Sequence, residues 1–315
     1  MTRLGFPKQK RVAGGSIGPS AIFAILLAWL IAPAAGAEGD LTAVQRGQRV
    51  FESAGGCTCH TNYPEEGTDA PWLAGGRGLS TPFGVYYSSN ITPDPTTGLG
   101  GFSQDDFLRA MQEGLSPEGH NYFPIFPYTA FTKMSDSDLE DLYAFLKTVP
   151  AIERSNQAPD APPPFSWRWT ITAWKWLNFK PGRQVPDPTQ SAAWNRGAYL
   201  VNGPGHCGEC HTPRTLSGGL DRGLWLAGSA EGPEGELAPN ITPDDETGIG
   251  DWSTADLVWY LETGFKPDGD DTQGLMAELI EHGFSDLSRS DRGAIAQYLK
   301  SVPAIQNQVQ GGSGQ

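Results

Sequence analysis

One five-residue stretch constrains the fold of this chain more than any other feature of its sequence: Cys207-Gly208-Glu209-Cys210-His211. Cysteines three residues apart on a helical turn face the same way, and each can form a thioether with a vinyl group of a haem. His211 follows directly and can place its imidazole on the haem iron. The pattern therefore predicts covalently bound haem c.

Two other kinds of site use closely spaced cysteines. A structural zinc site usually takes four protein ligands, and no second cysteine pair lies near this one in the sequence. A thioredoxin-like dithiol occurs in a βαβ context, and no such pattern surrounds Cys207. The sequence favours haem attachment over both alternatives.

A shorter copy of the motif lies in the first half of the chain, at Cys57-Thr58-Cys59-His60. It has one residue between its cysteines instead of two. Positions two apart on a regular helix point about 200° apart, so two ordinary thioethers are hard to form. We expect haem bound through Cys59 and His60, with the bond to Cys57 in doubt.

The two motifs belong to a tandem repeat that extends through most of the chain. The stretch 90–94, Asn-Ile-Thr-Pro-Asp, recurs at 240–244, and each half closes on a helical pattern followed by Val-Pro-Ala-Ile, at 149–152 and 302–305. Each half has the size of a small domain. The sequence predicts an all-α fold of two tandem cytochrome c-like domains, with short helices and long loops around covalent haem.

The N-terminus has the pattern of an export signal. A basic region precedes an apolar run from Ala21 to Ala32, and Ala35-Gly36-Ala37 matches a cleavage site. The run is shorter than the roughly 20 residues that span a bilayer, although an uncleaved anchor is the alternative. The predicted segments are a signal peptide at 1–37, cytochrome c domain 1 at 38–150, a linker at 151–187, domain 2 at 188–305 and a flexible tail at 306–315.

The charge of the chain limits its partners. Loss of the signal peptide removes four positive charges and takes the net charge from −14 to −18. This balance argues against nucleic-acid binding. It suits a periplasmic protein that meets a basic patch on a partner, although solubility alone would also explain it.

The predicted linker is rich in proline and in aromatic residues. We expect its aromatic side chains to pack between the two domains, with a surface for a partner subunit or for the membrane interface as the alternative. These residues are Phe165, Trp167, Trp169, Trp174, Trp176 and Phe179.

The sixth iron ligands decide the redox behaviour, because a methionine opposite the histidine raises the potential. Met276, in a predicted loop before the last helix, is the candidate for the second haem. Met134, directly before the helix cap Ser135, is either the first haem's ligand or a packing residue. Met111 has the pattern of a helix core residue, and His120 is a further option.

Longer motifs resemble those of the diheme c-type cytochromes related to the cytochrome subunits of membrane-associated alcohol, gluconate and sugar dehydrogenases. They lie at 90–94, 122–128, 194–200 and, most specifically, 205–214. The resemblance covers nearly the whole mature chain and implies two haem c groups, at His60 and at His211 with Met276.

The sequence departs from that family in three ways. The first motif is one residue short, position 126 is Phe where many relatives have Met, and the third haem domain of the dehydrogenase subunits is missing. The departures at the first motif and at position 126 put the attachment and the sixth ligand of the first haem in question.

These observations predict an exported, periplasmic diheme cytochrome that transfers electrons from a dehydrogenase subunit to a quinone, another cytochrome or an oxidase. Peripheral membrane association is a further expectation. Two alternatives stay open. One is a haem enzyme with an open site on the first haem, of peroxidase or thiosulfate dehydrogenase type, and the other is a structural subunit of a dehydrogenase complex.

Overall fold

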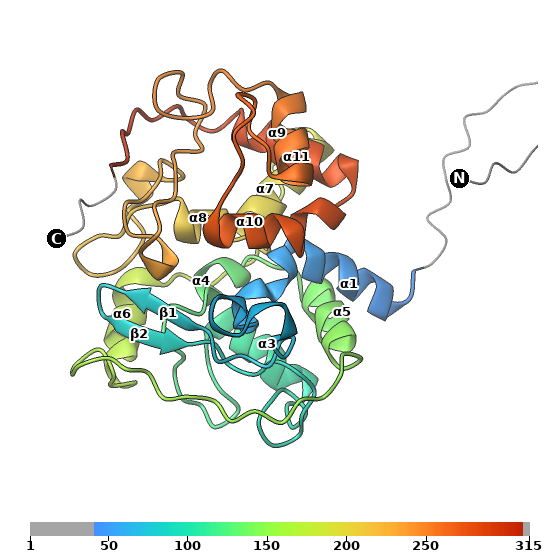
Figure 1. Cartoon of the computed structure of the whole chain (residues 1–315), viewed down its shortest axis with the longest axis vertical. Helices are drawn as coiled ribbons and strands as arrows, with labels where there is room; N and C mark the ends of the chain where they lie inside the picture. Colours follow the sequence, from blue (N-terminus) through green and yellow to red (C-terminus); the bar gives the residue numbers. More distant parts are fainter. Residues whose placement is uncertain (1–40, 311–315) are drawn as a thin grey trace, which may run out of the picture. The chain divides into compact units, whose positions relative to one another are not determined.

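The computed structural model describes residues 41–310, which are mainly helical with long loops (Figure 1). The predicted signal peptide and the last five residues lie outside this range. The first half contains α1 (Ala43–Ser53), the 3-10 turn η1 (Gly55–His60), α2 (Tyr63–Glu66), η2 (Gly67–Asp69), α3 (Gln104–Glu113), α4 (Tyr128–Phe131) and α5 (Asp136–Leu146). After α6 (Thr170–Asn178) come α7 (Ala192–Asn202), α8 (Cys207–Cys210), η3 (Arg222–Leu224), η4 (Pro233–Gly235), α9 (Thr254–Thr263), α10 (Gly274–Glu281), η5 (Phe284–Asp286) and α11 (Arg289–Leu299).

One small antiparallel hairpin departs from the all-α prediction. Strands β1 (Gly78–Thr81) and β2 (Gly84–Tyr87) pair with Gly78 opposite Tyr87. Each strand has four residues, and neither alternates between buried and exposed positions. The hairpin therefore leaves no period-2 pattern in the sequence from which it could have been predicted.

Equivalent signals begin and end the same helix in each half. Ser103 and Ser253 accept hydrogen bonds from the third helical residue of α3 and of α9, and an aspartate at that position bonds back to the cap. These are capping boxes. Gly114 and Gly264 end the two helices in the left-handed conformation. Local signals therefore set both ends of this helix in each half.

The first and last helices of each half cross at a glycine, and Figure 1 shows α1 beside α5. A Cβ atom on Gly47 would lie 1.9 Å from the carbonyl oxygen of Asp141 in α5. A Cβ atom on Gly197 in α7 would lie 2.0 Å from that of Ala294 in α11. Glycine is the residue that allows such an approach, so the sequence repeat is also a repeat of helix packing.

The repeated Asn-Ile-Thr-Pro-Asp loops are bonded alike. The side-chain amide of Asn90 donates to the carbonyl oxygen of Ile152, and that of Asn240 donates to that of Ile305, both at 2.7 Å. Each loop is thereby tied to the segment that follows the last helix of its half. The loop and the Val-Pro-Ala-Ile stretch therefore recur together because they contact each other.

A buried arginine connects the two halves. The side chain of Arg77 is 2% exposed and donates to the carboxylates of Glu234 and Glu278, at 2.5 Å each. The hydroxyl of Thr58, inside η1, also donates to Glu278, at 3.3 Å. A buried guanidinium without partners would lose several kcal/mol of hydration, and the two carboxylates offset this loss.

The described residues belong to one unit of contacts. The division into domains at 38–150 and 188–305, with a linker at 151–187, therefore stays a prediction. Within residues 41–310, no helix has both the length and the apolar content needed to cross a membrane.

The aromatic residues of the predicted linker fall into two groups. Trp174 and Phe179 pack edge-on against Tyr128, with ring centroids 6.4 and 5.2 Å apart. Trp169 and Trp176 are 69% and 85% exposed, and Phe165 and Trp167 are also exposed. Packing of all these residues between the halves was the wrong expectation, because four of the six are exposed and the other two contact Tyr128 of the first half.

Candidate haem sites

The two motif histidines have the same environment. Nδ1 of His60 lies 2.7 Å from the carbonyl oxygen of Ser89, and Nδ1 of His211 lies 2.7 Å from that of Pro239. A carbonyl oxygen only accepts, so Nδ1 carries the proton and Nε2 is the atom that can bind a metal. Burial lowers the pKa of both imidazoles, which favours the neutral, ligating form.

The second motif forms the helical turn that its spacing predicts. Helix α8 spans Cys207–Cys210, and the backbone N–H of His211 donates to the carbonyl oxygen of Cys207 at 2.9 Å. His206 enters the turn in the left-handed conformation, with φ of 38°. The two cysteines are therefore one turn apart.

The first motif does not form a regular helix. Gly56 and Cys57 both adopt left-handed backbone angles inside η1, with φ of 66° and 49°. The assumption that Cys57 and Cys59 lie two apart on a helix is therefore wrong. The missing residue is accommodated at Cys57, whose conformation costs roughly 1–3 kcal/mol for a residue other than glycine. The doubt about a thioether at Cys57 now rests on this backbone, which differs from the helical one at Cys207.

None of the four cysteines forms a disulfide bond. Burial raises the pKa of Cys57, Cys207 and Cys210 to about 12, and that of Cys59 to about 11. A redox dithiol needs a thiolate with a lowered pKa, so this alternative is not supported. Residues 41–310 also contain no cluster of three or more His, Cys, Asp or Glu that could hold a metal ion.

Each motif packs against the other half of the chain. A Cβ atom on Gly56 would lie 2.0 Å from the carbonyl oxygen of His282, directly after α10. In the reciprocal contact, Phe131 of α4 packs edge-on against His206, with ring centroids 5.5 Å apart, and Thr129 donates a hydrogen bond to Glu209. The two motifs therefore both lie at the contact between the halves.

Met276 is half-buried against the core of the second half. It lies in helix α10, whereas the glycines before it led to the expectation of a loop. The loop is wrong because Gly274 is the first residue of α10, where the side chain of Glu236 accepts a hydrogen bond from the N–H of Leu275. A carboxylate near a helix N-terminus stabilises the helix.

The three candidates in the first half have different environments. Met134 is fully buried in the core after α4, and Met111 is buried on α3, as its helical pattern predicts. His120 is exposed in a turn, where its N–H donates to the hydroxyl of Ser116. Burial of Met134 does not distinguish a ligand from a packing residue.

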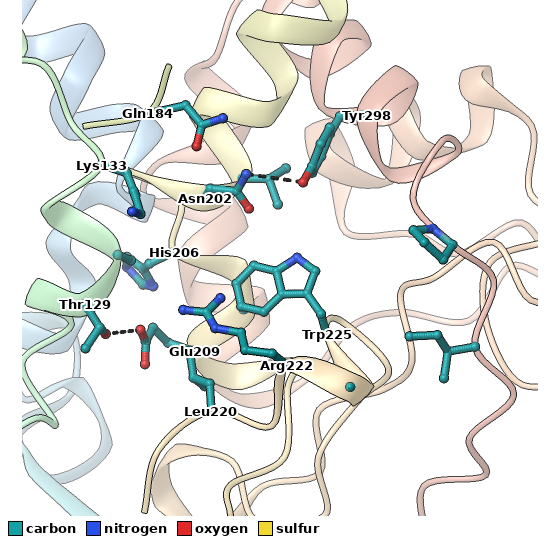
Figure 2. A pocket seen from close by; sticks show the side chains of 16 residues that line it. Thr129, Lys133, Gln184, Asn202, His206, Glu209, Leu220, Arg222, Trp225 and Tyr298 are labelled. Carbon is teal, nitrogen blue, oxygen red and sulfur yellow. Dashed lines mark hydrogen bonds between the residues drawn. The ribbon is translucent and has the colours of Figure 1, made fainter. Parts of the chain in front are cut away.

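A cavity of about 570 Å³ lies beside the second motif (Figure 2). Lys133 and Arg222 line it, together with His206 and Glu209 of the motif segment. Burial, followed by the nearby charge of Arg222, lowers the pKa of Lys133. Gly208 and Glu209 of the motif line this cavity, whereas the motif cysteines and His211 do not. No local pattern predicts this cavity, because its walls come from distant segments of the chain.

Arg77 is a further residue that the sequence analysis missed. The positive charge of Arg77 lowers the pKa of the Cys59 thiol, although burial dominates and raises it. A buried cation therefore lies close to the first motif. The sequence around Arg77 does not indicate that its side chain is buried and paired, because both of its carboxylate partners come from the other half of the chain.

Known proteins are similar to this chain over most of its length, although no family model matches it. The diheme cytochrome c-type of Cereibacter sphaeroides is 42% identical over 262 residues, which are 83% of this chain and 86% of that protein. The chain belongs to the diheme c-type cytochromes. The predicted resemblance is therefore confirmed.

Other relatives of this cytochrome are parts of dehydrogenases. The fructose dehydrogenase cytochrome subunit of Gluconobacter japonicus is 40% identical over 263 residues, 83% of this chain and 53% of that subunit. The gluconate 2-dehydrogenase cytochrome c subunit of Pantoea cypripedii is 37% identical over 273 residues, again 83% of this chain, and 60% of that subunit. The cytochrome thus spans a little more than half the length of these subunits.

The described residues fit the haem c that the family implies. Each motif offers free thiols and a neutral imidazole whose Nδ1 is already engaged by a backbone carbonyl. This donor set is the one that covalent haem requires. The fit holds for the second motif in full and for Cys59 and His60 in the first.

Proposed function

We propose that this protein is an exported diheme c-type cytochrome that carries electrons from a dehydrogenase to a respiratory acceptor. The observation that supports it most is the matched pair of histidines, each next to a cysteine and each bonded through Nδ1 to a backbone carbonyl. Its relatives among dehydrogenase cytochrome subunits support a dehydrogenase as the partner.

The residues of the second half have defined roles in this proposal. Cys207 and Cys210 attach the haem, His211 binds the iron and Met276 supplies the sixth ligand. When bound, the haem supplies a reversible one-electron couple. The carbonyl of Pro239 fixes the orientation of the neutral His211 imidazole through Nδ1. Apolar side chains surround the site and exclude water.

In the first half, Cys59 attaches the haem and His60 binds the iron. Cys57 contributes no ordinary thioether in this proposal. Met134 is the candidate sixth ligand from the sequence, and packing in the core explains its burial equally well.

The position of the motifs supports electron exchange within the chain. Both motifs lie at the contact between the halves, where each packs against residues of the other half. We infer that an electron enters at one haem and leaves from the other. The donor is a dehydrogenase subunit, and the acceptor is a quinone, a cytochrome or an oxidase.

The exposed aromatic side chains near α6 supply a contact surface. Trp167 and Trp169 stack on each other with ring centroids 5.7 Å apart, and Trp176 is the most exposed of the group. Exposed aromatic clusters are typical of protein interfaces. We assign this surface to the dehydrogenase partner. Export to the periplasm and peripheral membrane association complete the proposal.

A reductive titration tests the proposed function. The purified mature protein should take up two electrons per chain from a low-potential donor and return them to a ferric cytochrome c. A carrier should not turn over hydrogen peroxide or thiosulfate. Steady turnover of either substrate would favour the haem enzyme alternative, and uptake of no electrons would contradict the proposal.

A further inference from the structure

The two halves share a turn in the same register. The backbone N–H of Tyr122 donates to the carbonyl of Gly114 at 2.9 Å, and that of Thr272 donates to that of Gly264 at 3.0 Å. Tyr122 and Thr272 are 150 positions apart, and so are Gly114 and Gly264. The halves are therefore aligned without insertion through this turn, and the alignment comes from hydrogen bonds as well as from sequence.

Phe126 and Met276 are each four residues beyond this turn, Phe126 just before α4 and Met276 inside α10. Each is half-buried, and each packs against the core of its own half. The register is lost between this turn and the helix caps Ser135 and Ser288, which are 153 positions apart. Counted from the shared turn, the proposed sixth ligand Met276 corresponds to a phenylalanine.

The surroundings of Phe126 contain further aromatic rings. The ring centroids of Tyr122, Phe131 and Tyr128 lie 5.5, 5.7 and 6.1 Å from that of Phe126. A phenyl ring has no lone pair to donate to iron. Aromatic side chains also disfavour the entry of ions, because an ion would lose its hydration there.

Three other side chains are candidates for this ligand. His282 lies next to Gly56 of the first motif, and its imidazole stacks on the ring of Tyr63, with ring centroids 4.9 Å apart. Met134 is equivalent to Leu287, a core residue of the second half. Its side chain lies toward the end of α7, where a Cβ atom on Gly203 would be 3.5 Å from its Cγ. His120 is exposed.

We propose that the haem at His60 has no protein ligand at its sixth position, and that this position binds small neutral ligands such as carbon monoxide or nitric oxide. The proposal rests on the proposed function, because it needs a haem at His60. Phe126 replaces the methionine of the second half and leaves the iron open to molecules that enter an apolar site. In this proposal Met134 is a packing residue of the core and not an iron ligand.

Titration of the reduced protein with carbon monoxide tests the proposal. Binding is monitored through the change in the Soret band of the protein. The native protein should bind one carbon monoxide per chain. Phe126→Met places a thioether at the equivalent of Met276 and should abolish that binding. Met134→Leu is the matched control and should leave the stoichiometry at one.

Two results would overturn the proposal. One is a native protein with two haems that binds no carbon monoxide. The other is an increase in carbon monoxide binding in Met134→Leu, which would make Met134 the ligand. A haem count by pyridine haemochrome on the same sample separates the two claims. Fewer than two haems contradicts the proposed function, whereas two haems without binding contradicts this inference alone.

Discussion

Met276→Ala should bind two molecules of carbon monoxide per chain, one more than the native protein. The thioether is the proposed sixth ligand of the second haem, so its removal opens that iron. A methionine ligand raises the potential, and axial ligands tune haem potentials over about 0.8 V. We therefore expect one midpoint potential to fall by on the order of 0.1 V or more, and the thioether-to-iron charge-transfer band to disappear.

Spectroelectrochemistry and carbon monoxide titration measure these changes. Met111→Ala is the control, because Met111 is buried on α3 in the core of the first half and is not a proposed ligand. Its spectrum and both potentials should match the native protein. An unchanged spectrum in Met276→Ala would mean that another residue binds the second iron.

Arg77→Met should lower the free energy of unfolding by about 3–5 kcal/mol. Methionine retains much of the length of the side chain but leaves Glu234 and Glu278 without their shared cation. Both carboxylates are mostly buried, so water cannot fully replace the lost hydrogen bonds. Urea unfolding of the haem-loaded protein at neutral pH, followed by tryptophan fluorescence, measures the loss.

An exposed ion pair provides the comparison for this variant. Lys266 and Asp270 are 2.7 Å apart, with side chains 36% and 63% exposed. Asp270→Asn should therefore lower the free energy of unfolding far less than Arg77→Met does. Equal losses in Arg77→Met and Asp270→Asn would show that the buried bridge between the halves contributes no more than a surface pair.

Sequence patterns predicted the features of the fold that depend on interactions between neighbouring residues. The turn around Cys207 depends on a few neighbouring residues, and it is found in the structure. Contacts between distant segments were not predictable. Arg77 gives no local sign of its partners, which are 157 and 201 positions away.

Two predictions failed because the backbone departs from a regular helix or begins one unexpectedly. Cys57 adopts a left-handed conformation that a helical projection does not include. Gly274 starts α10, although glycine is more typical of loops and helix ends. The substitution at position 126 was visible in the sequence, but its equivalence to Met276 rests on the hydrogen-bonded turn that precedes both residues.

The mass of the denatured, alkylated mature chain tests the central claim most directly. We predict a chain that begins after Ala37 and carries two covalent haems and one alkyl group, on Cys57. Two haems without an alkyl group would show that Cys57 also forms a thioether and would refute only that detail. A mass with a single haem would contradict the account of this protein as a diheme cytochrome.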